Sequence, residues 1–346
     1  MRIVPLLLVA ASLVLGTGVA FGDSPKALKL ALVLQWEGRD LKEGNLEAIR
    51  AFRSVFTDVN FVHLVSPAYF LRSSADAALA QTKIRSLMKP KDQIGVALAG
   101  WKSLATKAGV IFRSGPTFWG NTMDQTECAV DCGLDVPVNL YPGEDLDALL
   151  ASALDTLELN GFGRPRGMTT EGWVAAPEVL EAASRAGLRY DFSAVSPEMV
   201  APRVQRFPLF HWVKTLWPQV TPHTQPFVIT TAKSSLREIP QSLAALDYST
   251  ATEVLQVFKE YTEILKKNPA VELTFPLVIY QETANVTLPV LAKVLQGIFA
   301  HAQNNDLAIE PLELPGLELP GSLVAEGARP LPDEGGVRPL HEPMVH

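Results

Sequence analysis

Three side chains able to act as acids or bases follow the first two apolar runs of this 346-residue chain. Glu37 and Asp40 come directly after the first run, and His63 lies near the end of the second. In barrels of parallel strands, the carboxyl ends of the strands face the active site. Glu37, Asp40 and His63 are therefore candidate catalytic residues for hydrolysis. The alternative is structural, with Asp40 capping a helix and His63 satisfied by hydrogen bonds in the core.

Aromatic side chains form a second group of candidates, for binding rather than catalysis. Trp36, Trp101 and Trp173 follow predicted strand ends or lie in loops. Indole faces stack on the apolar faces of pyranose rings, so tryptophans at a barrel mouth would suit a glycan. The alternative is ordinary packing, since tryptophan is usually largely buried.

The elements that must position these residues alternate between apolar runs of strand length and amphipathic stretches of helix length. Strands are expected at 28–35, 59–65, 93–99, 136–140, 227–231 and 271–280. Helices are expected at 44–55, 75–88, 145–160, 177–186, 251–267 and 286–302. This alternation predicts an α/β fold with a parallel sheet, and the number of units favours a distorted (β/α)7-type barrel. No glycine-rich phosphate-binding motif follows the first strand, which argues against a dinucleotide-binding fold.

Composition and charge narrow the class of partner. Hydrophobic residues make up 47% of the chain and charged residues 19%, enough to bury a large core. The net charge is −7 and no basic cluster occurs, so nucleic acid is not an expected partner. No pair of histidines has the HxH, HxxxH or HExxH spacing of a metal site. No G-x-S-x-G motif supports a Ser-His-Asp esterase.

The two ends of the chain differ from its middle. Residues 1–22 combine a positive Arg2, an apolar run too short for a stable membrane span, and small residues before Asp23, which predicts a signal peptide. A signal peptide implies that the protein is exported to the periplasm or the extracellular space. In such an oxidising compartment, Cys128 and Cys132 are expected to form a disulfide on an irregular loop. The folded domain is expected at 23–308, with residues 309–346 forming an extended or disordered Pro-rich tail. Truncation after Ile309 should then barely change thermal stability.

Several segments resemble the polysaccharide deacetylase family of NodB-type carbohydrate esterases. They are residues 94–104 (IGVALAGWKSL), 112–119 (FRSGPTFW), 171–180 (EGWVAAPEVL) and 186–195 (AGLRYDFSAV), with a weaker match at 277–284 (LVIYQETA). Their order and spacing carry the similarity. The resemblance implies a distorted (β/α)7 barrel that removes acetyl groups from glycans. It also implies an Asp and two His holding a divalent metal such as zinc, a carboxylate base, a later His as acid and an Arg that orients the base.

The sequence departs from this pattern where it can be compared. The paired histidines of the family fall on Ala97 and Ala99, its arginine on Thr169 and its late histidine on Tyr280. A methyl group cannot ligate a metal, so no metal site and no cofactor are expected. Arg166 and Tyr280 remain candidates for substrate binding.

The interpretation is an exported, polysaccharide deacetylase-like protein that binds a cell-envelope or extracellular glycan, such as a peptidoglycan-like polysaccharide, with a degenerate deacetylase site. Two alternatives remain. The chain is an active carbohydrate hydrolase with a relocated site that uses Glu37, Asp40 and His63, or it is a non-enzymatic scaffold that binds a partner.

Overall fold

The computed structural model describes residues 26–314, apart from residues 74, 125–127, 129–130 and 269–270. The strands are β1 (Lys26–Trp36), β2 (Phe61–Val65), β3 (Gln93–Leu98), β4 (Gly167–Thr170), β5 (Tyr190–Asp191), β6 (Phe227–Thr230), β7 (Ser235–Glu238), β8 (Leu273–Tyr280) and β9 (Leu307–Pro311). The helices are α1 (Glu43–Val55), α2 (Ala68–Leu71), α3 (Ala77–Arg85), α4 (Lys102–Ala108), α5 (Gly143–Leu159), α6 (Pro177–Arg185), α7 (Pro197–Val204), α8 (Pro208–Leu216), α9 (Ala251–Lys267) and α10 (Ala284–Asn304).

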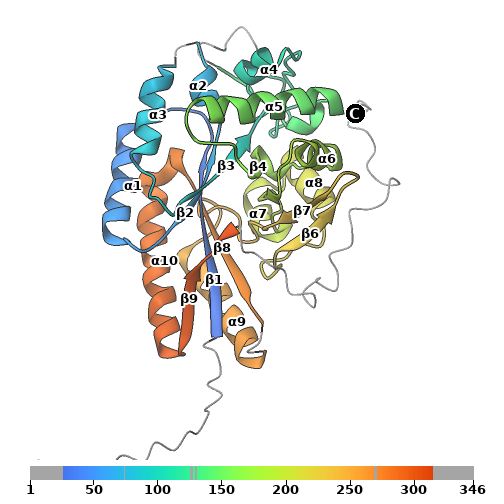
Figure 1. Cartoon of the computed structure of the whole chain (residues 1–346). Coiled ribbons are helices and arrows are strands. Elements are labelled where there is room, and N and C mark those ends of the chain that lie inside the picture. The colour runs from blue at the N-terminus through green and yellow to red at the C-terminus, as the bar shows by residue number, and fades with distance from the viewer. Residues whose placement is uncertain (1–25, 74, 125–127, 129–130, 269–270, 315–346) are drawn as a thin grey trace, which may run out of the picture.

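Seven parallel strands follow one another around a curved sheet in the order β7-β5-β4-β3-β2-β1-β8 (Figure 1). The chain after β7 then returns to the opposite edge, where Ala245 forms a parallel bridge with Val278 of β8. The backbone N–H of Leu246 donates to the carbonyl of Val278 at 2.9 Å. The two edges of the sheet therefore meet, and the predicted distorted (β/α)7-type barrel is confirmed. β6 pairs antiparallel with β7, outside the ring.

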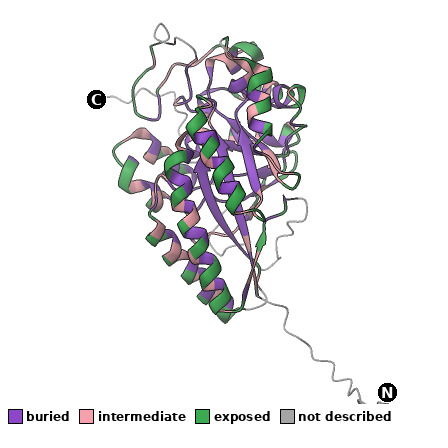
Figure 2. Ribbon diagram, turned by 90° about the vertical axis from the view of Figure 1, so that its left-hand side faces the viewer, coloured by how far each residue is buried: buried purple, intermediate pink, exposed green. Residues whose placement is uncertain are grey.

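Alternating side chains of the strands supply two separate cores. On β1, Leu30, Leu32 and Leu34 point outward and pack in the large core beneath the helices, here called the outer core. Ala31 and Val33 point inward and join a smaller core inside the barrel, here called the inner core. Figure 2 shows the result as buried strands covered by helices whose outer faces are exposed. Both faces of the sheet are covered, which explains why the strands are nearly continuous apolar runs.

One long helix resembles a membrane span by composition. The 24-residue stretch Gln281–Asn304, which contains α10, is long and apolar enough to cross a membrane. In the structure, Leu288, Leu291 and Leu295 of this helix are buried in the outer core. The apolar character of α10 is therefore accounted for by its packing on the barrel.

One predicted strand is wrong. Residues 136–140 contain a 3₁₀ helix, η2 (Val138–Leu140), instead of a strand. Pro137 has no N–H to donate to a neighbouring strand, and the N–H of Tyr141 closes the turn by donating to the carbonyl of Val138 at 3.1 Å. Local hydrogen bonds therefore give this segment a 3₁₀-helical turn, and it does not pair with the sheet.

The boundary predicted between domain and tail is also wrong, because the chain beyond 308 is part of the barrel. β9 pairs in parallel with the first half of β1, and the N–H of Leu312 donates to the carbonyl of Leu30 at 2.9 Å. Leu312 and Leu314 are each 6% exposed and belong to the inner core. The carbonyl of Leu314 accepts a hydrogen bond from the Tyr190 hydroxyl. Residues 1–22 and 315–346, the predicted leader and the rest of the tail, lie outside the described residues.

Candidate functional site

Four acidic side chains gather at one end of the barrel. Glu37 follows β1, Glu171 follows β4 and Glu282 lies two residues after β8. The carboxyl ends of these parallel strands lie at the same end of the barrel, here called the mouth. Asp135, from the loop between α4 and α5, is near enough for its charge to act on Glu37 and Glu171. We call Glu37, Asp135, Glu171 and Glu282 the carboxylate cluster.

Hydrogen bonds across the mouth hold two of the four carboxylates, those of Glu171 and Glu282. Gln35 Nε2 donates to Oε2 of Glu171 at 2.9 Å, which links β1 to the end of β4. Oε1 of Glu282 accepts from the backbone N–H of Glu37 at 3.1 Å and from the Tyr69 hydroxyl at 2.6 Å. The carboxyl groups of Glu171 and Glu282 are therefore held in defined positions, as acid–base chemistry requires.

Glycines directly after two of the glutamates let the chain turn away from its strand. Gly38 has φ +94°, and a Cβ there would meet the Ser66 Oγ at 2.6 Å. Gly172 has φ +67°, and a Cβ there would meet the Phe118 ring at 2.5 Å. Both conformations favour glycine, and both positions lack room for a side chain. The pairs Glu37-Gly38 and Glu171-Gly172 therefore place each carboxylate at the point where its strand ends.

Positive charge at the mouth is limited. Arg39 Nε lies 3.7 Å from Oε2 of Glu37, and its guanidinium lies 3.8 Å from Oδ1 of Asp135. The Arg39 side chain is 52% exposed, whereas that of Glu37 is 15% exposed. Solvent therefore screens much of its attraction. Among the described residues, no other ion pair involves a member of the cluster.

The pKa values of the glutamates are raised in consequence. Burial raises the pKa of Glu171 to about 8, and the charges of Asp135 and Glu282 add to the effect. Burial, followed by the charge of Glu171, raises the pKa of Glu37 well above its ordinary value. Burial also raises the pKa of Glu282. Because neighbouring negative charges oppose one another's ionisation, the cluster keeps at least one proton at neutral pH.

Tyrosine hydroxyls accompany the carboxylates. Burial, and then the negative charge of Glu171, raises the pKa of both Tyr248 and Tyr280. Burial, and then the charge of Glu282, raises the pKa of Tyr69. All three hydroxyls therefore stay protonated and can donate hydrogen bonds. The structure thus brings the predicted Tyr280 together with Glu37.

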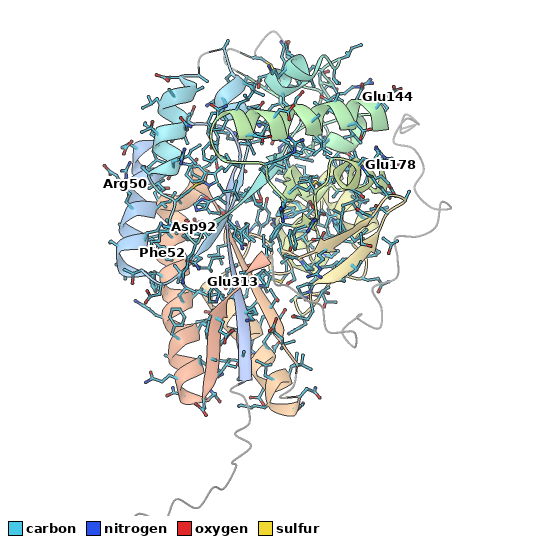
Figure 3. The ribbon with its side chains drawn as sticks, viewed as in Figure 1. Arg50, Phe52, Asp92, Glu144, Glu178 and Glu313 are labelled. Atoms are coloured by element: carbon cyan, nitrogen blue, oxygen red, sulfur yellow. A yellow bond between two sulfur atoms is a disulfide. The ribbon has the colours of Figure 1, made fainter. Side chains whose placement is uncertain are left out.

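The other two predicted catalytic residues are not part of the cluster. The Asp40 side chain is 74% exposed, and its contact is with Arg72 at 4.0 Å. His63 is in the middle of β2 and fully buried, so the prediction that it faces the mouth is wrong. Its Nδ1 accepts from Trp36 Nε1 at 3.2 Å, and its Nε2 lies 3.1 Å from Oδ2 of Asp92. Figure 3 labels Asp92, which also pairs with a buried arginine of α1. Burial lowers the pKa of His63, which favours the neutral ring.

The predicted tryptophan surface is wrong as well. Trp36, Trp101 and Trp173 are 0%, 5% and 2% exposed, so none offers an indole face to a glycan. Trp101 instead supports the site, because its Nε1 donates to the backbone carbonyl of Glu37 at 2.9 Å. Trp173 Nε1 donates to Oε1 of Gln241 at 2.9 Å.

Arg166 lies at the other end of the barrel. It immediately precedes β4, at the amino end of that strand, and is exposed. Its carbonyl accepts backbone hydrogen bonds from Arg189 and Tyr190 at the start of β5. Arg166 therefore does not share the mouth with the carboxylate cluster, and its role in substrate binding stays a prediction.

The residues at the mouth do not fit the divalent metal that the family resemblance implies. Ala97 and Ala99 are each 2% exposed, and Ala97 packs inside the barrel. In the described part of the chain, no three His, Cys, Asp or Glu side chains are arranged to hold a metal ion. The donor set that remains consists of carboxyl groups whose raised pKa values favour a bound proton.

Sequence reasoning missed Glu171, Glu282 and Asp135. Glu282 lies two residues after the predicted strand 271–280, so a positional signal was present for it, whereas the short strand β4 that precedes Glu171 was not among the expected strands. Asp135 gave no such signal, since its loop is far from any strand end in the sequence. Only the closure of the barrel brings these residues together.

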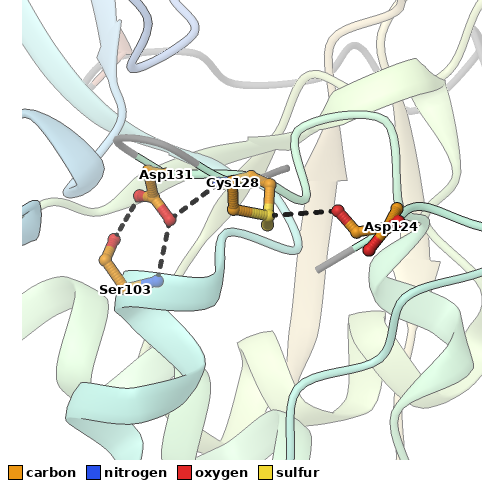
Figure 4. Close-up of a disulfide and its surroundings, with 5 residues drawn as sticks. Ser103, Asp124, Cys128 and Asp131 are labelled. Atoms are coloured by element: carbon orange, nitrogen blue, oxygen red, sulfur yellow. Dashed lines mark hydrogen bonds between the residues drawn. A yellow bond between two sulfur atoms is a disulfide. The ribbon is translucent and has the colours of Figure 1, made fainter. Parts of the chain in front are cut away.

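The two cysteines are bonded to each other on the loop before Asp135. Their Cα atoms are 5.5 Å apart. Asp131, between them, accepts from the Ser103 hydroxyl at 2.6 Å and from the Ser103 N–H at 3.1 Å (Figure 4). Cys128 Sγ lies 3.8 Å from the carbonyl of Asp124. These contacts tie the loop to the start of α4.

Comparisons with known proteins find similarity only among solved structures. No protein-family model and no curated protein matches the sequence. Among solved structures, the chain is similar to a putative polysaccharide deacetylase from Mycobacterium smegmatis, with 11% identity, a TM-score of 0.48, and 85% of this chain and 90% of that chain covered. It is also similar to a family 4 carbohydrate esterase from Streptomyces lividans, with 8% identity, a TM-score of 0.41 and coverage of 83% and 94%.

A third similar structure is a CE4 family pseudoenzyme from Bacillus anthracis, with 6% identity, a TM-score of 0.41 and coverage of 84% and 65%. At such identities and TM-scores, the roles of residues in this chain rest on its own geometry.

Proposed function

We propose that this protein is an exported, deacetylase-like carbohydrate hydrolase that uses carboxyl groups at the barrel mouth in place of the family's metal site. The observation that carries the proposal is the carboxylate cluster. Three glutamates from different strands are held at one point with raised pKa values, and one half-exposed arginine offsets their charge. Such an arrangement opposes folding, and perturbed carboxyl pairs of this kind are typical of active sites.

Glu171 is the proposed general acid. With its pKa raised to about 8, it is mostly protonated at neutral pH and can donate to a leaving group. Its carboxyl group is oriented by the hydrogen bond from Gln35. Glu171 is of intermediate exposure, so the residue is not fully enclosed by the protein.

Glu282 is the proposed general base. Its Oε1 accepts two hydrogen bonds, from Glu37 N and the Tyr69 hydroxyl, which favour the ionised form. Its Oε2 is buried and has no hydrogen-bond partner among the described residues, so one acceptor position of this carboxyl group is unused. Glu37 belongs to the same cluster and is assigned neither the acid nor the base role. The charges of Glu171 and Glu282 act on its carboxyl group. The pair of a protonated and an ionised carboxyl group supports hydrolysis by acid–base catalysis.

The carbohydrate class of the substrate rests on the motif resemblance. The matching segment 171–180 builds η3 (Glu171–Trp173) at the site and begins α6, and the proposed acid is its first residue. The buried tryptophans argue against a purely stacking, non-catalytic glycan platform. Substrate recognition is therefore assigned to the hydroxyl and carboxyl groups of the mouth.

The test is hydrolysis of N-acetylated oligosaccharides, followed both as released acetate and as new reducing ends. We expect turnover by the wild-type protein, with Glu171→Gln and Glu282→Gln each lowering kcat by about 100-fold or more. Glu47→Gln, an exposed glutamate of α1, is the matched control and should leave kcat unchanged. Acetate release would identify the bond as an acetyl ester or amide, and reducing ends would identify it as glycosidic. Unchanged kcat in both cluster variants, or no turnover of any oligosaccharide, would overturn the proposal.

A further inference from the structure

A cavity of about 720 Å³ lies at the end of the barrel opposite the mouth. It is formed where β5 and β7 begin, by the hairpin between β6 and β7 and by the end of α6. Its volume lies within the range of pockets that hold small organic ligands. None of the residues of the carboxylate cluster lines it, so it is separate from the proposed active site.

Three cationic side chains line this cavity and no carboxylate does. They are Arg189, Lys233 and Arg237. Lys233 Nζ donates to the carbonyl of Arg185 at 3.0 Å, and none of the three cations forms an ion pair within the described part of the chain. In a chain whose net charge is −7, a cluster of cations without acidic partners is unexpected from composition. The positive charge is therefore available to a ligand.

The backbones of two of these residues are hydrogen-bonded to each other. The N–H of Arg237 donates to the carbonyl of Arg189 at 2.8 Å, and Arg237 stands opposite Tyr190 in the parallel pairing of β5 and β7. Both residues line the cavity, so their guanidinium groups can offer several N–H donors to one oxyanion bound there. Arg189 and Lys233 are exposed, so solvent reaches the cavity.

Hydroxyl groups complete the wall. Ser184 is 2% exposed, and its Oγ lies 2.6 Å from the Ser234 Oγ and accepts from the Thr231 hydroxyl at 2.7 Å. Ser234 also lines the cavity. Serine hydroxyls can both donate and accept, which suits the oxygens of an acid group or of a sugar ring beside it.

We propose that this cavity is a binding site for an anionic organic ligand of saccharide size, whose carboxylate or phosphate is held by Arg189, Lys233 and Arg237. Two sources can supply the same acid group. One is a separate acidic saccharide. The other is this chain, whose residues 315–346 include Glu318, Glu326, Asp333, Glu334 and Glu342.

The experiment is calorimetric titration of the full chain with digalacturonate and, separately, with inorganic phosphate, at low salt. We expect digalacturonate to bind and neutral maltose not to bind. Arg189→Ala/Arg237→Ala should weaken binding at least tenfold. Lys107→Ala/Lys214→Ala removes two exposed cations from α4 and α8 and is the matched control, with an expected change of less than twofold.

A second full-length variant separates the two sources. It carries glutamine at the four tail glutamates and asparagine at Asp333. Tighter binding of digalacturonate by this variant would show that the chain's own acid groups occupy the site, and unchanged binding would identify a separate ligand. The proposal fails if neither this variant nor the wild type binds an anion, or if binding survives Arg189→Ala/Arg237→Ala. Because the measurement is binding at the other end of the barrel, its outcome is independent of hydrolysis at the mouth.

Discussion

Replacing Leu314 by alanine is expected to destabilise the barrel, although this residue belongs to a segment whose composition predicts a solvated tail. The Leu314 side chain is 6% exposed and packs in the inner core with Leu312, Tyr190 and Phe192. Its N–H donates to Gln93 Oε1 at 3.3 Å, and its carbonyl accepts from Tyr190. Alanine keeps both backbone hydrogen bonds, so the substitution removes packing alone.

The expected magnitude follows from the cost of emptying a packed core. Leu→Ala at buried positions costs about 2 to 5 kcal/mol, and most where the surroundings cannot collapse into the space. The hydrogen-bonded strands of the barrel restrict such collapse, so we expect a loss of about 3 kcal/mol in the free energy of unfolding. At about 2 to 4 °C per kcal/mol for a large domain, Tm should fall by about 6 to 12 °C.

The assay is urea unfolding followed by tryptophan fluorescence, with calorimetry for Tm. Leu159→Ala is the matched control, because Leu159 is 81% exposed at the end of α5 and its loss should cost no more than about 0.5 kcal/mol. If Leu314→Ala unfolds like Leu159→Ala, the chain after β9 does not seal the barrel, and the domain boundary predicted at 308 is restored.

Two further predictions concern buried carboxyl groups. The pKa of Glu171 in the folded protein is raised to about 8. The contribution of this residue to the free energy of unfolding is therefore fully present below its ordinary pKa and is lost as the pH rises through about 8, because the folded state then has to bury a charge. Glu171→Gln should therefore gain stability over wild type by up to about 5 kcal/mol at about pH 9 and by little at about pH 5, measured by urea unfolding. Equal pH profiles for both proteins would contradict this. Asp191 and Glu238 are both 0% exposed and stand opposite each other on β5 and β7, and burial raises the pKa of each. Glu238→Gln keeps an acceptor for the N–H of Ala194 and should raise the free energy of unfolding by about 1 to 3 kcal/mol above neutral pH, whereas a loss at that pH would show that the pair needs its charge.

The strands and helices could largely be predicted from the sequence because their signals are local. The runs around β1, β3 and β8 are apolar over strand length, and α9 is amphipathic with a capping box at Thr250 and Glu253. The number of such units was enough to favour a barrel. The segment at 136–140 could not be predicted in this way, since its apolar composition suits a strand while Pro137 prevents sheet pairing.

The site was predicted only in part, because periodicity does not say which face of a strand points into the barrel. Trp36 and His63 lie on the outward face, under the helices, although both are near strand ends in the sequence. Gln35, next to Trp36, points the other way and reaches Glu171. A single residue of register therefore separates a core aromatic from a residue that orients the proposed acid.

The sequence by itself determined the longer strands and helices, the position of Glu37 at a strand end, and the absence of imidazoles at residues 97 and 99. These properties depend on residue type and on neighbours within a few positions. Only the tertiary structure decided that Glu37, Glu171 and Glu282 share one mouth and that Leu314 seals the other end. Those contacts join segments far apart in the chain, and they form because the curved parallel sheet closes on itself and brings its strand ends together.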